Sequence, residues 1–542
     1  MRMVTRGLTA IGCVALLSGC AGVSGGASAP IAAMPPLGGM DQQKIRHIVI
    51  IVQENRSFDD LFGGPEATIP GIDAVAYGRV LGGTPRLLTP ASLADDPDPD
   101  HDHYDPPHDR CGVGGWAEYN DFGRYDAYIP ANCGARNPAL SYSYVRERER
   151  RPYVEMAKRY TVADRFFTAN SGPSWPAHQY LIAGHDDEIA DLPKGALEWE
   201  GCSNRKGENE TRRLSPAGVE GPTDAEPPCF GHLSLGSLVD AQNLTWRMYG
   251  PRETSPGNAF DSIKRESHKY ARDDWDRHVS WPMTNVALDA NPAAGGLSGI
   301  APVLANLTWV VSSDSVPGFT FQGQVTPVCG YHAGNYTNMS DHPGAGAGCY
   351  GPSYVEHLVN AIGTSPFWNS TAILILWDDS GGFYDHVPPF TRWMNLSGKL
   401  VPDRMGPGNR TGLIVISPYA KNHYVSHVTY DFGSVLRFVE KHLGLGTLNP
   451  RNDYDGAIDN YVYSENAGYP FAGFEPPPKP YTQPSARTAL HPINDLDDCF
   501  DFEKQPAQFQ EFPTPGDGVT DSQADFYTAA RAAKAAASPP QI

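Results

Sequence analysis

Three short apolar runs constrain the fold of this chain most strongly, because each has the length and composition of a buried β-strand. They lie at residues 45–52 (IRHIVIIV), 371–377 (TAILILW) and 412–417 (GLIVIS), and polar or turn residues follow each of them. Near-continuous hydrophobicity is typical of strands buried on both faces, as in a parallel sheet. Helical patterns lie between these runs, at 153–160, 175–184, 352–362 and 432–443. The alternation predicts a three-layer α/β/α fold with a mainly parallel central sheet, and such sheets place their sites at the C-terminal ends of the strands.

The composition fits one large, loop-rich domain. The chain has 542 residues, of which 40% are hydrophobic, and it contains 56 glycines and 49 prolines. A chain with this much apolar sequence buries a large core and is not disordered. Its formal charge of −20, with no cluster of Lys and Arg, argues against a nucleic acid partner. Stretches rich in Gly, Pro and Asp, such as 62–110 and 185–230, predict long loop insertions.

The first 20 residues have the pattern of an export signal. Two arginines precede an apolar run at 7–17 that is too short to span a bilayer, and small residues lead to Cys20. A Cys in this place resembles a bacterial lipoprotein signal, in which the Cys becomes the lipidated first residue. An ordinary signal peptide is the alternative. We therefore expect an exported protein, anchored in a membrane through Cys20 and facing the periplasm or the cell surface, with secretion as the alternative. Residues 21–43 predict a flexible linker.

Cysteine usage agrees with an oxidising compartment. Seven cysteines remain after Cys13 and Cys20, and they show no CxxC or Cys/His metal spacing. Their grouping suggests three local disulfides, one of several connectivities that the sequence allows, and leaves Cys499 over. The three pairs are Cys111 with Cys133, Cys202 with Cys229, and Cys329 with Cys349.

Carboxylates follow two of the predicted strands. Asp378 and Asp379 come directly after the run at 371–377, and adjacent carboxylates repel each other unless a cation or protons compensate them. Glu54 and Asn55 follow the first run and offer a carboxylate and an amide oxygen, which are hard ligands. Adjacent side chains of an extended strand point to opposite faces, so this second pair serves one site only if the backbone turns there. The alternative for both motifs is a solvated polar turn.

A serine and three histidines complete the candidate residues. Ser174 lies just before a helical stretch, where unpaired N–H groups and the helix dipole suit a phosphate and an activated nucleophile. The alternative is an ordinary helix N-cap. His108, His268 and His342 each follow a polar loop, where a histidine stabilises phosphoryl oxygens or protonates a leaving alkoxide. Taken one at a time, each of them also fits a surface or structural histidine.

At these residues the chain resembles the bacterial phosphoesterase family that holds acid phosphatases and non-specific phospholipases C. The resemblance covers about residues 45 to 445, and its motifs occur in the family's order. They are HIVIIVQENRSFDDLFG, DPPHDRCGVGGWAEYN, PSWPAHQYLIAG, NLTWRMYG, SDHP, AILILWDDSGGFYDHVPP and GLIVISPYAKNHYVSHVTYDFGSVLRFVE.

The resemblance implies an alkaline-phosphatase-like fold with a hydroxyl nucleophile beside a divalent metal ion, either Mg, Ca, Mn or Zn. It implies that Ser174 is the nucleophile and that His108 and His342 line the phosphate pocket. His268 matches less directly, because the stretch from 268 to 341 is enlarged here. Many relatives carry a His where this chain has Ser380, which weakens transfer of their substrate preference. The implied metal ligands are Glu54, Asn55, Asp378 and Asp379.

The function expected from this resemblance is hydrolysis of phosphate esters through a phosphoserine intermediate. A phosphomonoesterase of the acid phosphatase type fits best, and a phospholipase C that cleaves phospholipid head groups is the alternative. An inactive surface-binding lipoprotein is the alternative of another class. We expect a catalytic domain at 44–445. A Pro-rich extension at 446–542, with a terminal helix near 522–537, is expected to pack on the same domain.

Overall fold

The structure of the chain is a computed structural model, and it describes part of the chain. Several predictions concern residues outside this part, namely the predicted export signal with Cys20, the predicted linker, His108 and the predicted terminal helix. The cysteines of two predicted disulfides, Cys111 with Cys133 and Cys329 with Cys349, also lie outside it. The described residues are 44–65, 69–78, 86–95, 142–189, 192–195, 201–203, 209–214, 227–250, 257–280, 285–291, 301–312, 316–317, 336–337, 339–343, 350–387, 389–396, 399–403, 405–448, 457–459, 461–465 and 489–513.

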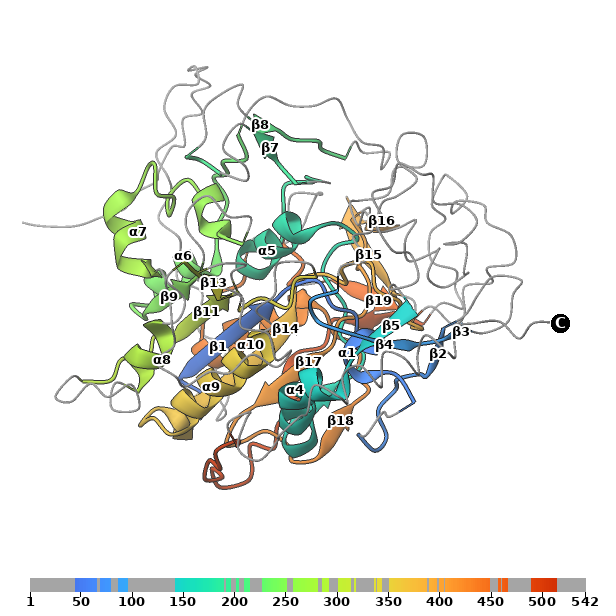
Figure 1. Cartoon of the computed structure of the whole chain (residues 1–542). Coiled ribbons are helices and arrows are strands. Elements are labelled where there is room, and N and C mark those ends of the chain that lie inside the picture. Colours follow the sequence, from blue (N-terminus) through green and yellow to red (C-terminus); the bar gives the residue numbers. More distant parts are fainter. Residues whose placement is uncertain are drawn as a thin grey trace, which may run out of the picture. The chain divides into compact units, whose positions relative to one another are not determined.

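An eight-stranded, mainly parallel sheet forms the centre of the fold, which confirms the predicted mixed α/β class. Its strand order is β10-β9-β11-β1-β14-β17-β6-β18, and β1, β14 and β17 lie side by side at its middle (Figure 1). Every neighbouring pair is parallel except the two pairs that involve β17. The strands are β1 (His47–Gln53), β6 (Thr161–Ala163), β9 (Trp246–Tyr249), β10 (Val279–Ser280), β11 (Leu307–Val311), β14 (Thr371–Trp377), β17 (Leu413–Ile416) and β18 (Tyr424–Ser426).

Helices cover both faces of this sheet. Trp309 of β11 donates its ring N–H to Leu181 of α5, whereas the ring of Trp377 of β14 packs edge-on against Tyr153 of α4. Trp309 is paired with Ile50 of β1 and Trp377 with Gln53. Ile50 and Gln53 are an odd number of residues apart and therefore point to opposite faces. One layer contains α4 (Glu147–Arg159), α8 (Asn285–Ala290) and α9 (Gly351–Gly363), and the other contains α5 (Ser174–Ala183), α6 (Leu235–Ala241) and α10 (Phe432–Leu443).

The third predicted strand is present as β17, but its direction was not foreseen. Because β17 runs antiparallel to β14, its C-terminal end lies at the edge of the sheet where β14 begins. Ser417 accordingly donates a hydrogen bond to the carbonyl of Thr371 over 2.9 Å. The expectation that polar residues after this strand contribute to the site is therefore wrong. Residues 409–411, which precede β17, reach the site edge instead.

Helix α4 begins at Glu147, six residues before the predicted start. The prediction missed this turn because it contains buried charged side chains. Arg150 donates hydrogen bonds to the carbonyls of Leu61 and Gly63, and Glu149 accepts one from the backbone of Leu93 over 2.7 Å. These bonds compensate for burying the two charges.

Smaller elements surround the main sheet. A second sheet has the order β16-β15-β19-β20, and four two-stranded pairs and several short helices complete the described elements. No helix in these residues is both long and apolar enough to cross a membrane. The bounds are α1 (Phe58–Phe62), β2 (Tyr77–Gly78), β3 (Arg86–Leu87), β4 (Thr89–Ala91), β5 (Ser143–Val145), β7 (Lys194–Gly195), β8 (Asn209–Glu210), η3 (Ala259–Ser262), α7 (Arg272–His278), β12 (Val316–Pro317), β13 (Tyr336–Thr337), η4 (Trp368–Ser370), β15 (Thr391–Leu396), β16 (Lys399–Pro402), β19 (Val462–Ser464), β20 (His491–Pro492) and η5 (Leu496–Cys499).

Residues 489–513, which are one described part of the C-terminal extension, contact the main sheet and its flanking segments. The backbone of Ala507 donates to the carbonyl of Pro418 over 3.1 Å, and the ring N–H of Trp368 donates to the carbonyl of Ala507 over 2.8 Å. Pro418 follows β17, so these contacts lie at the edge where β14 begins. The opposite edge, where β1, β6 and β14 end, is the site edge.

Candidate active site

Two predicted ligand pairs lie next to each other at the site edge. Gln53 at the end of β1 is paired with Trp377 at the end of β14. Glu54 and Asn55 directly follow the first strand, and Asp378 and Asp379 directly follow the second. The adjacency of two parallel strands is what brings together residues more than 300 positions apart.

The backbone turns at Asn55, as the joint use of Glu54 and Asn55 requires. Asn55 has a φ of 58°, in the left-handed region that Asn tolerates better than most residues. Its N–H donates to Oδ1 of Asp378 over 3.0 Å, and the N–H of Arg56 donates to the carbonyl of Asp379 over 3.0 Å. As a result, the side chains of both Glu54 and Asn55 reach Ser174.

Gly381 explains the glycine pair in the DDSGG motif. It has a φ of 56°, and a Cβ atom at this position would lie 2.4 Å from the carbonyl oxygen of Asn55. Its N–H donates to Oδ1 of Asp379 over 2.7 Å. The turn after β14 thus packs directly on the turn after β1, and only a glycine fits between them.

Ser174 is the first residue of α5 and does not cap it. The N-cap is Pro173, which makes no side-chain cap, so the alternative of an ordinary serine N-cap is wrong. The Ser174 hydroxyl instead donates to Oδ2 of Asp379 over 3.0 Å, and its oxygen lies 3.4 Å from Oε2 of Glu54 and 3.5 Å from Oδ1 of Asn55. The hydroxyl therefore lies at a helix N-terminus and among three of the four predicted metal ligands.

His178 lies in the same cluster and was not among the predicted site residues. It follows Ser174 by one helical turn, and its Nε2 atom lies 3.4 Å from Oε1 of Glu54 and 3.6 Å from Oδ2 of Asp378. Burial alone would lower the pKa of His178, but Asp378 and Glu54 outweigh burial and raise that pKa to about 10. The signal available in the sequence was the spacing of four residues, which places both side chains on one helix face.

These side chains fit a divalent cation. Among the described residues, His178 is the only basic side chain within ion-pair distance of Glu54 or Asp378. Burial and the charge of Asp378 raise the pKa of Glu54 well above its ordinary value. Within that same part of the chain, Oδ2 of Asp378 and Nε2 of His178 are buried without a hydrogen-bond partner. One atom each from Glu54, His178 and Asp378 lie within 4.8 Å of one another, an arrangement that suggests a divalent metal site.

Of the predicted histidines, His342 lies near the cluster without joining it. Its loop is docked on the ends of both central strands, because Gln53 accepts from the N–H of Asp341 over 3.0 Å and the ring N–H of Trp377 donates to Asp341 over 2.9 Å. Nδ1 of His342 contacts the carbonyl of Pro343 over 2.8 Å. In the described part of the chain, no hydrogen bond joins His342 to Ser174.

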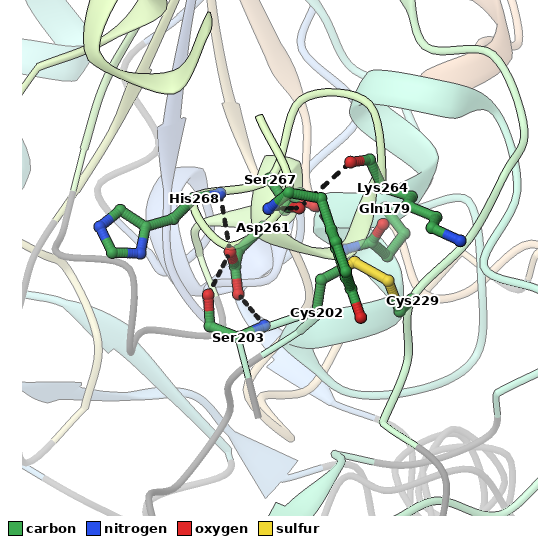
Figure 2. Close-up of a disulfide and its surroundings, with 10 residues drawn as sticks. Gln179, Cys202, Ser203, Cys229, Asp261, Lys264, Ser267 and His268 are labelled. Atoms are coloured by element: carbon green, nitrogen blue, oxygen red, sulfur yellow. Dashed lines mark hydrogen bonds between the residues drawn. A yellow bond between two sulfur atoms is a disulfide. The ribbon is translucent and has the colours of Figure 1, made fainter. Parts of the chain in front are cut away.

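His268 lies elsewhere, beside the predicted Cys202–Cys229 disulfide, which the structure contains. Its backbone N–H donates to Asp261, which also accepts from the backbone and hydroxyl of Ser203 (Figure 2). The ring points away from the disulfide, contacts Arg272 and packs edge-on against Trp275 of α7. No described contact joins His268 to the Ser174 cluster. The predicted leftover cysteine, Cys499, is a buried free thiol.

A buried ionic network beside the cluster was also missed. Arg410 donates to Oδ1 of Asp385 over 2.9 Å and to the carbonyls of Asp73 and Asp164, each over 2.8 Å. His386 contacts Asp59 over 2.7 Å and Asp73 over 3.1 Å. The network joins the loop after β14 to helix α1, which follows the loop that carries Glu54 and Asn55.

The chain is similar in sequence to bacterial phospholipases C. The non-hemolytic phospholipase C of Pseudomonas aeruginosa is 24% identical over 444 residues, which are 74% of this chain and 54% of that protein. Phospholipase C A of Mycobacterium tuberculosis is 24% identical over 460 residues, 79% of this chain and 78% of the relative. The chain thus spans about half the length of the Pseudomonas protein.

A solved structure and a family model also match. The structure is that of a protein in the alkaline phosphatase superfamily from Vibrio parahaemolyticus, which aligns with a TM-score of 0.30 and 10% identity over 71% of this chain and 81% of that one. The family model matches residues 45–446, which include both central strands, Ser174 and every described member of its cluster. On the strength of this match across most of its length, the chain belongs to the Phosphoesterase family.

Proposed function

We propose that this protein is a metal-dependent hydrolase of phosphate esters with Ser174 as its nucleophile. One observation carries the proposal: the Ser174 hydroxyl lies at the N-terminus of a helix, 3.0 to 3.5 Å from oxygens of Asp379, Glu54 and Asn55. Membership of the Phosphoesterase family supports the class of phosphoric ester hydrolases.

The proposed ligands of the cation are Glu54, Asn55, Asp378 and Asp379. A divalent cation in such a site supplies positive charge that lowers the pKa of a nearby hydroxyl and neutralises phosphoryl oxygens. The protein contributes the orientation of Ser174, whose proton faces Oδ2 of Asp379. The positive end of the α5 helix dipole favours an anionic group beside the hydroxyl.

The reaction follows from this placement in two steps. The Ser174 oxygen attacks phosphorus, the bond from phosphorus to the ester oxygen breaks, and the leaving oxygen takes up a proton. Water then cleaves the phosphoserine, which releases phosphate and restores the hydroxyl. We assign His342 and His108 to protonating the leaving oxygen or binding the phosphoryl oxygens.

For the substrate, we propose a phosphomonoester, because the Asp378-Asp379-Ser380 sequence resembles the acid phosphatase branch. Ser380 accepts a hydrogen bond from Asn409 over 3.0 Å. Two neutral side chains therefore lie where many relatives carry a His. A phospholipase C activity is the second candidate, and the names of the relatives favour it. An inactive surface-binding lipoprotein is the third.

Paired assays on the full-length chain test these candidates. Inorganic phosphate release from p-nitrophenyl phosphate is compared with diacylglycerol release from phosphatidylcholine vesicles, before and after chelation. Phosphate release that chelation abolishes supports the monoesterase, and diacylglycerol release supports the phospholipase. If neither phosphate nor diacylglycerol is released, the proposal of a hydrolase is overturned, and the inactive surface-binding lipoprotein is the remaining candidate.

The nucleophile is tested with Ser174→Ala and a matched control, Ser365→Ala. Ser365 is a buried serine whose hydroxyl donates to the carbonyl of Ile362 over 2.6 Å, and it lies before the start of β14, whereas the cluster lies at the end of that strand. We expect Ser174→Ala to lower kcat by about 1,000-fold or more, as for other catalytic nucleophiles, and Ser365→Ala to keep its kcat. Near wild-type turnover of Ser174→Ala would show that another group attacks phosphorus.

We also propose that Cys20 carries a lipid that anchors the exported protein. The proposal rests on the charged start, the short apolar run and the small residues before Cys20. Metabolic labelling with a fatty-acid analogue in an expressing bacterium should label the wild type and not Cys20→Ala. Equal labelling of both would contradict lipidation at this residue.

A further inference from the structure

We infer that His178 is a nitrogen ligand of the metal beside Ser174 and makes this site selective for the metals that favour imidazole, such as Zn²⁺, over Mg²⁺ and Ca²⁺. The inference rests on the metal site of the proposed function and deepens it. Neither the sequence motifs nor the family match assigns a role to His178.

The helix places the imidazole where a ligand has to be. Ser174 and His178 are four residues apart on α5, so both side chains lie on the same face of the helix. The hydroxyl of Ser174 reaches Glu54 and Asp379, and the imidazole of His178 reaches Glu54 and Asp378. The two side chains therefore approach one set of carboxylates from the same helix.

The distances around Nε2 fit ligands of a shared ion better than hydrogen-bond partners. Nε2 lies 3.4 Å from Oε1 of Glu54 and 3.6 Å from Oδ2 of Asp378, which is longer than an ordinary N–H···O bond of about 2.7 to 3.2 Å. Two ligand atoms that are each about 2.1 Å from one ion lie roughly 3.0 to 3.5 Å apart. The separation from Glu54 falls within this range, and the separation from Asp378 lies just beyond it.

Burial strengthens the argument. His178 is 2% exposed and Asp378 is completely buried. Nε2 of His178 and Oδ2 of Asp378 lack hydrogen-bond partners among the described residues, although each faces the other. A buried polar atom without a partner is costly, and a cation bound by both atoms removes that cost.

The nitrogen decides which metals the site prefers. Carboxylate and amide oxygens alone suit Mg²⁺, Ca²⁺ and Mn²⁺, whereas imidazole suits Zn²⁺, Fe²⁺, Ni²⁺ and Cu²⁺. The ligands Glu54, Asn55, Asp378 and Asp379 would leave the choice of metal open. A fifth ligand from His178 shifts the metal preference of the site toward the metals that favour imidazole.

Metal binding to the full-length, chelator-treated protein tests the inference without an activity assay. The variants are His178→Gln and, as a matched control, His442→Gln. His442 is an equally buried histidine on α10 that contacts Asp497 over 3.2 Å. By calorimetry we expect the wild type to bind Zn²⁺ at least about 100-fold more tightly than Mg²⁺, as mixed nitrogen and oxygen ligands favour. His178→Gln should weaken Zn²⁺ binding by about 10-fold or more and Mg²⁺ binding by less than about 3-fold, and His442→Gln should change neither.

Electron spin-echo spectroscopy of the Mn²⁺-loaded protein gives a direct second measurement. The wild type and His442→Gln should show ¹⁴N coupling from a bound imidazole, and His178→Gln should lack it. Absence of ¹⁴N coupling in the wild type overturns the inference even if His178→Gln fails to fold. Equal losses of Zn²⁺ and Mg²⁺ affinity in a folded variant would also overturn it, because they would make His178 a general counter-ion.

The two proposals fail in different ways. A protein that shows the nitrogen coupling but releases neither phosphate nor diacylglycerol keeps the ligand assignment and loses the hydrolase. A protein that hydrolyses esters without the coupling keeps the hydrolase and loses the ligand assignment.

Discussion

Arg392 offers a sharp test of how buried charge stabilises this fold. The guanidinium is completely buried and donates to Asp403 over 2.7 Å and to Asp431 over 2.9 Å. It also donates to the carbonyls of Ala169 and Gly406. Asp431 is the N-cap of α10, and Ala169 lies in the loop that leads to Ser174. One side chain therefore links β15, helix α10 and the loop before the candidate nucleophile.

Replacement by methionine keeps much of the volume of Arg392 but removes the charge. Two carboxylates with fully buried side chains then lose their cation, and breaking a buried ion pair in this way costs about 3 to 5 kcal/mol. The entropy of unfolding of a 542-residue chain is about 1.1 kcal/mol per kelvin. Arg392→Met should therefore lower the Tm by about 3 to 4 °C.

Thermal unfolding followed by circular dichroism measures this change on the full-length chain. Arg165→Met is the matched control, because Arg165 forms a partly exposed ion pair with Glu465 over 2.9 Å. Such a pair contributes about 1 kcal/mol or less, so its Tm should fall by about 1 °C at most.

A double variant separates uncompensated charge from lost packing. Arg392→Met with Asp403→Leu removes one of the two carboxylates and should recover part of the lost Tm. If the double variant is no more stable than Arg392→Met, or if Arg392→Met matches the wild type, the reasoning from buried charge is refuted.

Three further changes test other parts of the structure. Gly381→Ala would press a Cβ atom against the carbonyl of Asn55, so we expect the Zn²⁺ affinity measured by calorimetry to fall about 10-fold or more. The control is Gly446→Ala, which has open space at its Cβ and should bind Zn²⁺ like the wild type. Burial alone would lower the pKa of His386, but two flanking carboxylates raise it to about 9. The stabilisation of the fold by charged His386 is complete below about pH 6.5 and disappears as pH rises through about 9. In thermal melts, His386→Asn should therefore lower the free energy of unfolding by about 3 kcal/mol at pH 6 and by almost nothing at pH 10. Burial raises the pKa of Glu266 to about 7, so the wild type loses stability as pH rises from about 4.5 to 7. The Tm of Glu266→Gln relative to the wild type should rise over that range, and an unchanged difference would contradict the assigned burial.

The central strands were predictable because burial on both faces leaves a plain pattern. The runs at 45–52 and 371–377 correspond to β1 and β14, and their shared parallel edge places Glu54-Asn55 beside Asp378-Asp379. The proximity of Ser174 was implied only by the resemblance, since no local pattern connects α5 to the ends of these strands.

Other features escaped for physical reasons. Hydrophobic pattern carries no information on strand direction, so the reversal of β17 was not foreseen. Strands β6 and β9 are too short to show a period of their own. Arginine is normally expected at the surface, but Arg392 and Arg410 are each fully buried among acidic side chains. His178 was not predicted because its partners, Glu54 and Asp378, are distant in sequence and meet it only in the folded chain.

The position of β1 in the sheet has a consequence for how the chain folds. Strand β1 pairs with β11 and β14, which follow it in the chain by about 260 and about 320 residues. The centre of the sheet therefore forms only through contacts of very high sequence separation. During synthesis, the apolar strand β1 stays without β14 until more than half of the chain has been made. An unpaired apolar strand is prone to aggregation. A fragment that ends before β14 should therefore neither fold nor bind metal, and formation of the metal site should report completion of folding.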